Sequence, residues 1–197
     1  MTETVTQPKT FSFTAENLAR AEKIIAKYPA GRQASAVIPL LDMAQRQSGN
    51  WLPQAAMDYV AVMLEMPPIH VYEVASFYTM FNLKPVGESF VQVCTTTPCW
   101  LRGSDEIVHI CKRKLGIGMN ETTPDGKFTL REVECMGACV NAPMVQINDD
   151  YFEDLTPEAM ELILEQMKAG TKPNAGSQTG RRGSCAQNGP TSLKEKV

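Results

Sequence analysis

The chain has 197 residues, 43% of them hydrophobic and 21% charged, and a formal net charge of −3. This length and apolar content predict one domain or two small ones with a real hydrophobic core. The mild acidity disfavours a nucleic-acid-binding protein, which normally carries a basic stripe. The sequence has no run of about 20 apolar residues and no signal-peptide pattern at its start, so we expect a protein of a reducing bacterial-type cytoplasm.

Apolar residues recur at helical spacing in the first part of the chain. Residues 1–12 are polar, and we expect them to form a flexible N-terminus. Four short amphipathic helices are predicted within residues 13–84, where they would form a small helical bundle. The residues expected to cap or open these helices are Thr14, Ser35, Pro53 and Pro67-Pro68.

Strand and helix patterns alternate within residues 85–168. We expect strands at 89–93 and 128–133, a helix from Cys99 to about Leu115 between them, and then a hairpin. A final helix is expected from its cap at Thr156 to about Lys168. The order β-α-β-β-β-α, with one long crossover, is typical of a thioredoxin-like α/β layer.

Residues 169–197 are rich in Gly, Ser, Asn and Thr, with few apolar side chains, so we expect a disordered, extended basic tail. Basic residues outnumber acidic ones five to one in this segment. Such a tail could cover the acidic body of the protein or reach a partner.

Four of the six cysteines form two pairs, and each pair follows a predicted strand. Cys94 and Cys99 are separated by four residues, and Cys135 and Cys139 by three. Two strand ends with two thiolates each could surround one metal centre, and all-thiolate sites select zinc or iron–sulfur clusters. Zinc sites favour shorter spacings, and a reducing compartment disfavours disulfides. An iron–sulfur cluster is therefore favoured, with zinc left open.

The sequences around these cysteines closely resemble a known family, the 24-kDa subunit of respiratory complex I (NADH-quinone oxidoreductase). The resemblance covers roughly residues 14–168. It rests on the segments Cys94-Thr-Thr-Thr-Pro-Cys99, Leu101-Arg102-Gly103-Ser104, Glu134-Cys135-Met136-Gly137-Ala138-Cys139, Asn141-Ala142-Pro143-Met144 and Val71–Tyr78.

This resemblance implies a thioredoxin-like [2Fe-2S] ferredoxin domain preceded by an N-terminal helical bundle. It places Cys94, Cys99, Cys135 and Cys139 on the family's cluster ligands. It also implies an electron-transfer subunit of an enzyme, without a complete active site of its own. The cluster would exchange one electron with FMN on the adjacent NADH-oxidising subunit, away from the main path to quinone.

The same resemblance implies a place for the protein. We expect contacts with the flavin subunit and other peripheral-arm subunits, at the cytoplasmic face of the bacterial inner membrane and without membrane insertion. A homodimer is possible when the chain is isolated. Two alternatives stay open: the equivalent diaphorase subunit of an NAD-linked formate dehydrogenase or hydrogenase, and a zinc-stabilised interaction module.

Smaller details can also be predicted around the ligand pairs. Gly137 is expected to adopt a positive φ, so that the second loop can approach the cluster closely. A cis peptide bond is hypothesised at Ala142-Pro143, where thioredoxin-like folds often carry one. Cys111 lies on an apolar helix face and is expected to be a buried small hydrophobe, whereas Cys185 is expected to be a free thiol or a contact residue in the tail.

Overall fold

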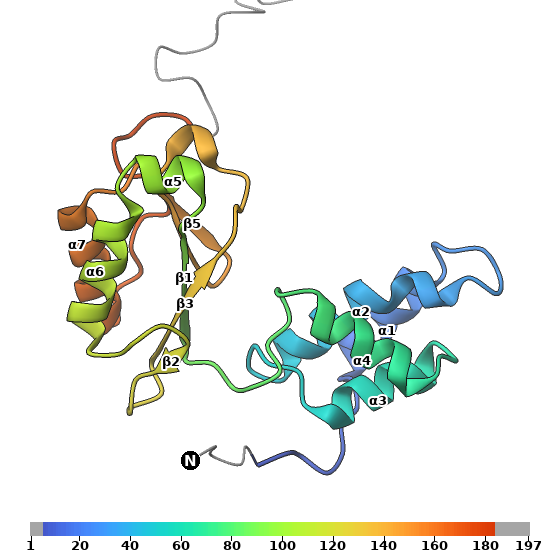
Figure 1. Cartoon of the computed structure of the whole chain (residues 1–197). Coiled ribbons are helices and arrows are strands. Elements are labelled where there is room, and N and C mark those ends of the chain that lie inside the picture. The colour runs from blue at the N-terminus through green and yellow to red at the C-terminus, as the bar shows by residue number, and fades with distance from the viewer. Residues whose placement is uncertain (1–5, 184–197) are drawn as a thin grey trace, which may run out of the picture. The chain divides into compact units, whose positions relative to one another are not determined.

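The computed structural model describes residues 6–183, and the chain divides into two compact units, residues 1–86 and 87–197 (Figure 1). Each unit has its own core of buried apolar side chains. No helix within residues 6–183 is both long and apolar enough to cross a bilayer.

The first unit is the predicted helical bundle. Its helices are α1 (Ala15–Ile25), α2 (Val37–Gln47), α3 (Gln54–Met63) and α4 (Pro68–Phe77), with a 3₁₀ turn η1 (Gln33–Ala36) before α2. Their apolar stripes meet in one core, where Leu40, Leu41 and Val60 are fully buried. Burial of these stripes stabilises helices that are too short to be stable alone.

Helix starts agree with the sequence-based expectations except at α2. The Thr14 hydroxyl accepts a hydrogen bond from the Asn17 amide at 3.2 Å, as a side-chain cap should. Pro53 and Pro67 precede α3 and α4 as predicted. The prediction that Ser35 caps α2 is wrong, because Ser35 lies within the 3₁₀ turn and α2 begins two residues later.

The segment that precedes α1 contacts the helical bundle through Gln7 and Phe11. Phe11 packs edge-on against Phe13 and Tyr59, with ring centroids 5.4 and 5.5 Å apart. Gln7 accepts a hydrogen bond from the Gln54 amide at 3.1 Å. Aromatic packing therefore anchors this segment to the bundle. The mostly polar composition of the segment did not predict this packing of Phe11 and Phe13.

The second unit is built on a mixed sheet. Its strands are β1 (Ser89–Cys94), β2 (Glu121–Thr122), β3 (Phe128–Val133), β4 (Val145–Ile147), β5 (Asp150–Glu153) and β6 (Gly176–Ser177). Their order is β2-β3-β1-β4-β5-β6. β1 and β3 are parallel, whereas β4 is antiparallel to both β1 and β5. Parallel pairing of β1 and β3 brings their carboxyl ends to the same edge of the sheet.

Helices α6 (Ser104–Leu115) and α7 (Pro157–Lys168) pack side by side on the sheet (Figure 1). Thr156 caps α7, and α6 ends at Gly116, which has a φ of +69°. A single helix from residue 99 to 115 was expected, and this is wrong. A short helix α5 (Thr97–Leu101) is separated from α6 because Gly103 adopts a φ of +91°.

The expectation of a disordered tail is wrong for its first part. Gly176–Ser177 form β6, which pairs in parallel with β5. Strands of two residues carry too little pattern to be recognised in a sequence, so β2 and β6 were not predicted. Residues 184–197, including Cys185, lie outside the described residues.

Candidate metal centre

The parallel β1–β3 pair places both cysteine pairs at one edge of the sheet. Cys94 is the last residue of β1 and lies opposite Val133, the last residue of β3. Cys99 follows on α5, and Cys135 lies two residues beyond β3. Sheet register therefore brings together two segments about 40 residues apart in the sequence.

The two pairs have different environments. Cys94 and Cys99 are each 1% exposed and form a small buried cluster with Ala138, the neighbour of Cys139. Cys135 and Cys139 are exposed, and their Sγ atoms are 3.1 Å apart. All four are free thiols. The arrangement offers two adjacent dithiol pairs, one buried and one at the surface.

This donor set suits a binuclear cluster. A structural zinc ion would need four ligands around one centre. A [2Fe-2S] cluster instead needs four thiolates spread over two irons, which two neighbouring pairs can provide. The residues present therefore fit this group.

Hydrogen bonds reach the sulfur atoms from both loops. The Thr96 hydroxyl lies 3.2 Å from Cys94 Sγ, and the Gly137 amide donates to Cys135 Sγ at 3.4 Å. Gly137 has a φ of +86°, which confirms the predicted left-handed conformation. The Thr96 hydroxyl was not singled out from the sequence.

The thiols differ in their readiness to ionise. Burial raises the pKa of Cys99 to about 12, and its hydrogen bond with Cys94 acts in the same direction. A hydrogen bond from Cys139 lowers the pKa of Cys135, and the same bond raises the pKa of Cys139. Cys135 is therefore the readiest of these three thiols to become a thiolate.

Backbone contacts fix the walls of the site. The Ala142-Pro143 peptide bond is cis, which confirms the hypothesis drawn from the sequence. The Cys94 amide donates to the Met144 carbonyl at 3.3 Å, and the Tyr151 hydroxyl donates to the Met136 carbonyl at 2.9 Å. Tyr151 was not singled out from the sequence, since it lies on the hairpin, far from both cysteine motifs.

Exposed apolar side chains lie next to the ligands in the sequence. Trp100 and Leu101 follow Cys99, and Val140 follows Cys139; they are 56%, 70% and 53% exposed. The Trp100 indole donates to Asp105 at 3.0 Å, which holds the ring in place. We call these three residues the apolar rim.

The remaining described cysteine lies in the domain core. Cys111 is 0% exposed and packs with the apolar residues of α6, as predicted. Burial raises the pKa of its thiol to about 12, so it stays protonated at neutral pH. It belongs to neither ligand pair.

A sheet of this topology with paired cysteines at one edge defines a class of electron-transfer protein. The sequence model of the thioredoxin-like [2Fe-2S] ferredoxin family matches residues 21–168, and the chain belongs to this family. This match confirms the expected fold and the expected type of cofactor. The ligand assignment by residue remains a prediction.

Curated relatives identify a more particular group. The chain is 65% identical to the E subunit of the NADH-quinone oxidoreductase of Rickettsia bellii over 158 residues, covering 80% of this chain and 95% of the relative. It is 57% identical to the mitochondrial NADH dehydrogenase [ubiquinone] flavoprotein 2 of Dictyostelium discoideum, covering 94% and 75%. The resemblance stated from the sequence is thus confirmed.

A solved structure of an NAD⁺-reducing [NiFe]-hydrogenase shares the fold. The TM-score is 0.58 at 21% identity, and the match covers 66% of this chain but only 22% of the hydrogenase chain. At this identity the likeness concerns the fold alone.

Proposed function

We propose that this chain is the electron-transfer subunit of an NADH:quinone oxidoreductase, and that Cys94, Cys99, Cys135 and Cys139 hold one [2Fe-2S] cluster. The observation that carries the proposal is the meeting of two dithiol pairs at the shared edge of β1 and β3. The identity of 65% with the Rickettsia bellii relative supports the choice of complex.

The residues of the site have separate tasks in this function. The bound cluster would supply a place for one electron. The buried thiols of Cys94 and Cys99 and the exposed thiols of Cys135 and Cys139 would hold the cluster. The Gly137 amide donates to Cys135 Sγ, and the Thr96 hydroxyl lies within hydrogen-bond distance of Cys94 Sγ. As donors to cluster-bound thiolates, both groups would stabilise the added negative charge.

The partner in this proposal is the NADH-oxidising subunit that carries FMN, within a peripheral arm at the cytoplasmic face of the inner membrane. The apolar rim supports this assignment, since exposed apolar residues beside an electron-transfer site suit a protein interface. Catalysis belongs to the complex, because NADH and FMN are bound by the partner.

A mixing experiment tests the partner. NADH should reduce the cluster only when the flavin-bearing subunit of the same complex is present, as followed by absorption and EPR spectroscopy. The variant Leu101→Glu should slow this reduction about tenfold, because a charge in the rim must be desolvated on docking. Leu162→Glu is the matched control, since Leu162 is a similarly exposed leucine, at 56%, on α7. Equal rates for both variants, or reduction by NADH alone, would refute the proposed docking.

A further inference from the structure

The carboxylate of Asp154 is the centre of a hydrogen-bond network just after β5. Arg181 Nε lies 3.0 Å from both of its oxygens, and Arg181 Nη2 lies 2.6 Å from Oδ1. The Ser177 hydroxyl and the Asn141 side-chain amide donate to Oδ2 at 2.6 and 2.9 Å. The Asp154 side chain is only 8% exposed, and a forked pair of this kind is among the stronger ionic interactions.

This network ends on the loop that carries the second cysteine pair. Arg181 Nη2 also donates to the carbonyl of Val140, the residue after Cys139, at 2.5 Å. The Asp154 amide donates to the carbonyl of Asn141 at 2.7 Å. Arg181 and Asp154 therefore hold the two residues that follow Cys139 through their backbone carbonyls.

The C-terminal segment is itself fixed to the sheet. Ser177 pairs with Glu153 in the β5–β6 ladder, and the Gln178 amide donates to the Glu153 carbonyl at 2.9 Å. Arg181 comes three residues later, so its guanidinium starts from an anchored backbone. A side chain from a free tail would lose more conformational entropy in making the same contacts.

We propose that Arg181 and Asp154 are positioning residues for the cluster, which clamp the Cys135–Cys139 loop to the C-terminal segment. This inference rests on the proposed function. Cys135 and Cys139 are exposed, whereas Cys94 and Cys99 are each 1% exposed, so the two sulfur atoms of the second pair have less packing around them. The ion pair of Arg181 with the 8% exposed Asp154 adds a second attachment for this loop. Arg181 also offsets the negative charge of Asp154 beside this loop, so that its loss would leave an unpaired carboxylate that disfavours the reduced cluster.

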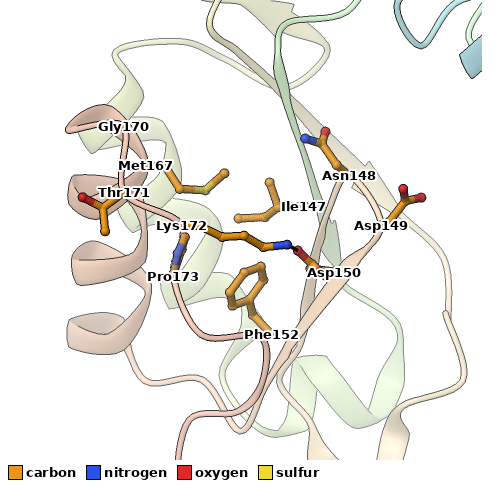
Figure 2. Close-up of a pocket in the computed structure, with 10 residues that line it drawn as sticks. All are labelled: Ile147, Asn148, Asp149, Asp150, Phe152, Met167, Gly170, Thr171, Lys172 and Pro173. Atoms are coloured by element: carbon orange, nitrogen blue, oxygen red, sulfur yellow. Dashed lines mark ion pairs between the residues drawn. The ribbon is translucent and has the colours of Figure 1, made fainter. Parts of the chain in front are cut away.

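Lys172 provides a matched control from the same segment. Figure 2 shows its ammonium group paired with Asp150, and the two atoms are 2.9 Å apart. Asp150 is the first residue of β5, whereas Asp154 lies just beyond its last residue, Glu153. The Lys172 pair is therefore an ion pair of equal charge that does not reach the ligand loop.

The test compares iron-loaded full-length variants in two measurements, the rate of iron release to a chelator and the midpoint potential. Arg181→Gln should release iron about tenfold faster and shift the potential to more negative values, since Asp154 is left unpaired. Arg181→Lys should keep a near-normal potential, because lysine retains the positive charge. It should still release iron faster, because a single ammonium group cannot make the contacts that two guanidinium nitrogens make with the Asp154 carboxylate. Lys172→Gln should resemble the unchanged protein in both measurements.

Equal rates of iron release and equal midpoint potentials in Arg181→Gln and Lys172→Gln would overturn the proposal that Arg181 and Asp154 position the ligand loop. If Arg181→Gln does not accumulate as folded protein, normal iron release from Arg181→Lys would overturn it instead. A starting protein without any iron–sulfur cluster would overturn the proposed function and the clamp together. A normal starting cluster with unaltered variants would overturn the clamp alone.

Discussion

The Thr96 hydroxyl lies 3.2 Å from Cys94 Sγ, and it also helps to lower the pKa of Cys135 in the other ligand pair. Thr96 occupies the loop between β1 and α5, at the point where the two dithiol pairs meet. A single side chain can therefore influence the charge on both sides of the proposed cluster.

Replacing Thr96 by Val should lower the midpoint potential of the cluster. One hydrogen bond that favours the reduced state is worth about 1 kcal/mol, which corresponds to roughly 40 mV for one electron. Redox titration followed by EPR measures the shift. Thr95→Val is the control, because the Thr95 hydroxyl donates to Glu132 at 2.6 Å instead of to sulfur. The account predicts no comparable shift in the control, and equal shifts would contradict it.

Gly137→Ala should weaken cluster retention without preventing folding. The φ of +86° costs an alanine about 1 kcal/mol, although an added Cβ would meet no atom within 4 Å. Relief of this strain would move the amide away from Cys135 Sγ. Gly116→Ala carries a similar strain at the end of α6, far along the chain from the ligands. Thermal stability should fall alike in both variants, whereas iron content should fall only in Gly137→Ala.

Glu153→Gln should stabilise the protein at neutral pH. Glu153 is 6% exposed, and its Oε2 atom has no hydrogen-bond partner within residues 6–183. Burial, and then the charge of Asp154, raise the pKa of this carboxyl group. The ionised form is therefore costly in the folded state, and this cost disappears as the pH falls through the raised pKa.

In Glu153→Gln the free energy of unfolding should rise by about 1 kcal/mol at pH 7, and this gain should become smaller toward acidic pH. Glu158→Gln should show the opposite sign. Hydrogen bonds from the backbone and from Thr156 at the start of α7 lower the pKa of Glu158 in the folded protein. Its ionised form therefore stabilises the fold at pH values above the pKa of the unfolded chain. This stability is lost as the pH falls through the lowered pKa of the folded state. Denaturant unfolding at about pH 4 and about pH 7 measures both trends. Equal pH trends for the two variants would contradict this account.

Cys111→Ser should separate folding from cluster binding. The change places a hydroxyl in an apolar core, which costs about 1–3 kcal/mol of unfolding free energy. The EPR spectrum of the reduced protein should stay the same, because Cys111 lies outside both pairs. An altered spectrum at unchanged iron content would show that the ligand set is wrong.

Local sequence patterns predicted most of the domain. The alternation in residues 128–133 gave β3 with its observed bounds, and Thr156 marked the start of α7. These elements depend on side-chain periodicity and caps, which are local. The break at Gly103 was missed because a single glycine within a helical pattern does not reveal whether its φ is positive.

The supporting contacts of the site were much harder to predict. Arg181 lies 27 residues from Asp154 in the sequence, and their contact depends on the pairing of β5 with β6. The polar composition of the tail predicted disorder, since such segments bury little apolar area. Here an ion pair and a two-residue strand fix the segment in place of apolar burial. Neither of them produces a local sequence pattern from which the ordered structure could be predicted.

The most direct test of the central claim is the metal content and EPR spectrum of anaerobically purified protein. Such protein should contain about two irons and two acid-labile sulfides per chain and give a rhombic signal after reduction. In Cys135→Ser this signal should be changed or lost. Colourless protein that contains zinc alone, or an unchanged signal in Cys135→Ser, would contradict the assignment of a [2Fe-2S] cluster to these four cysteines.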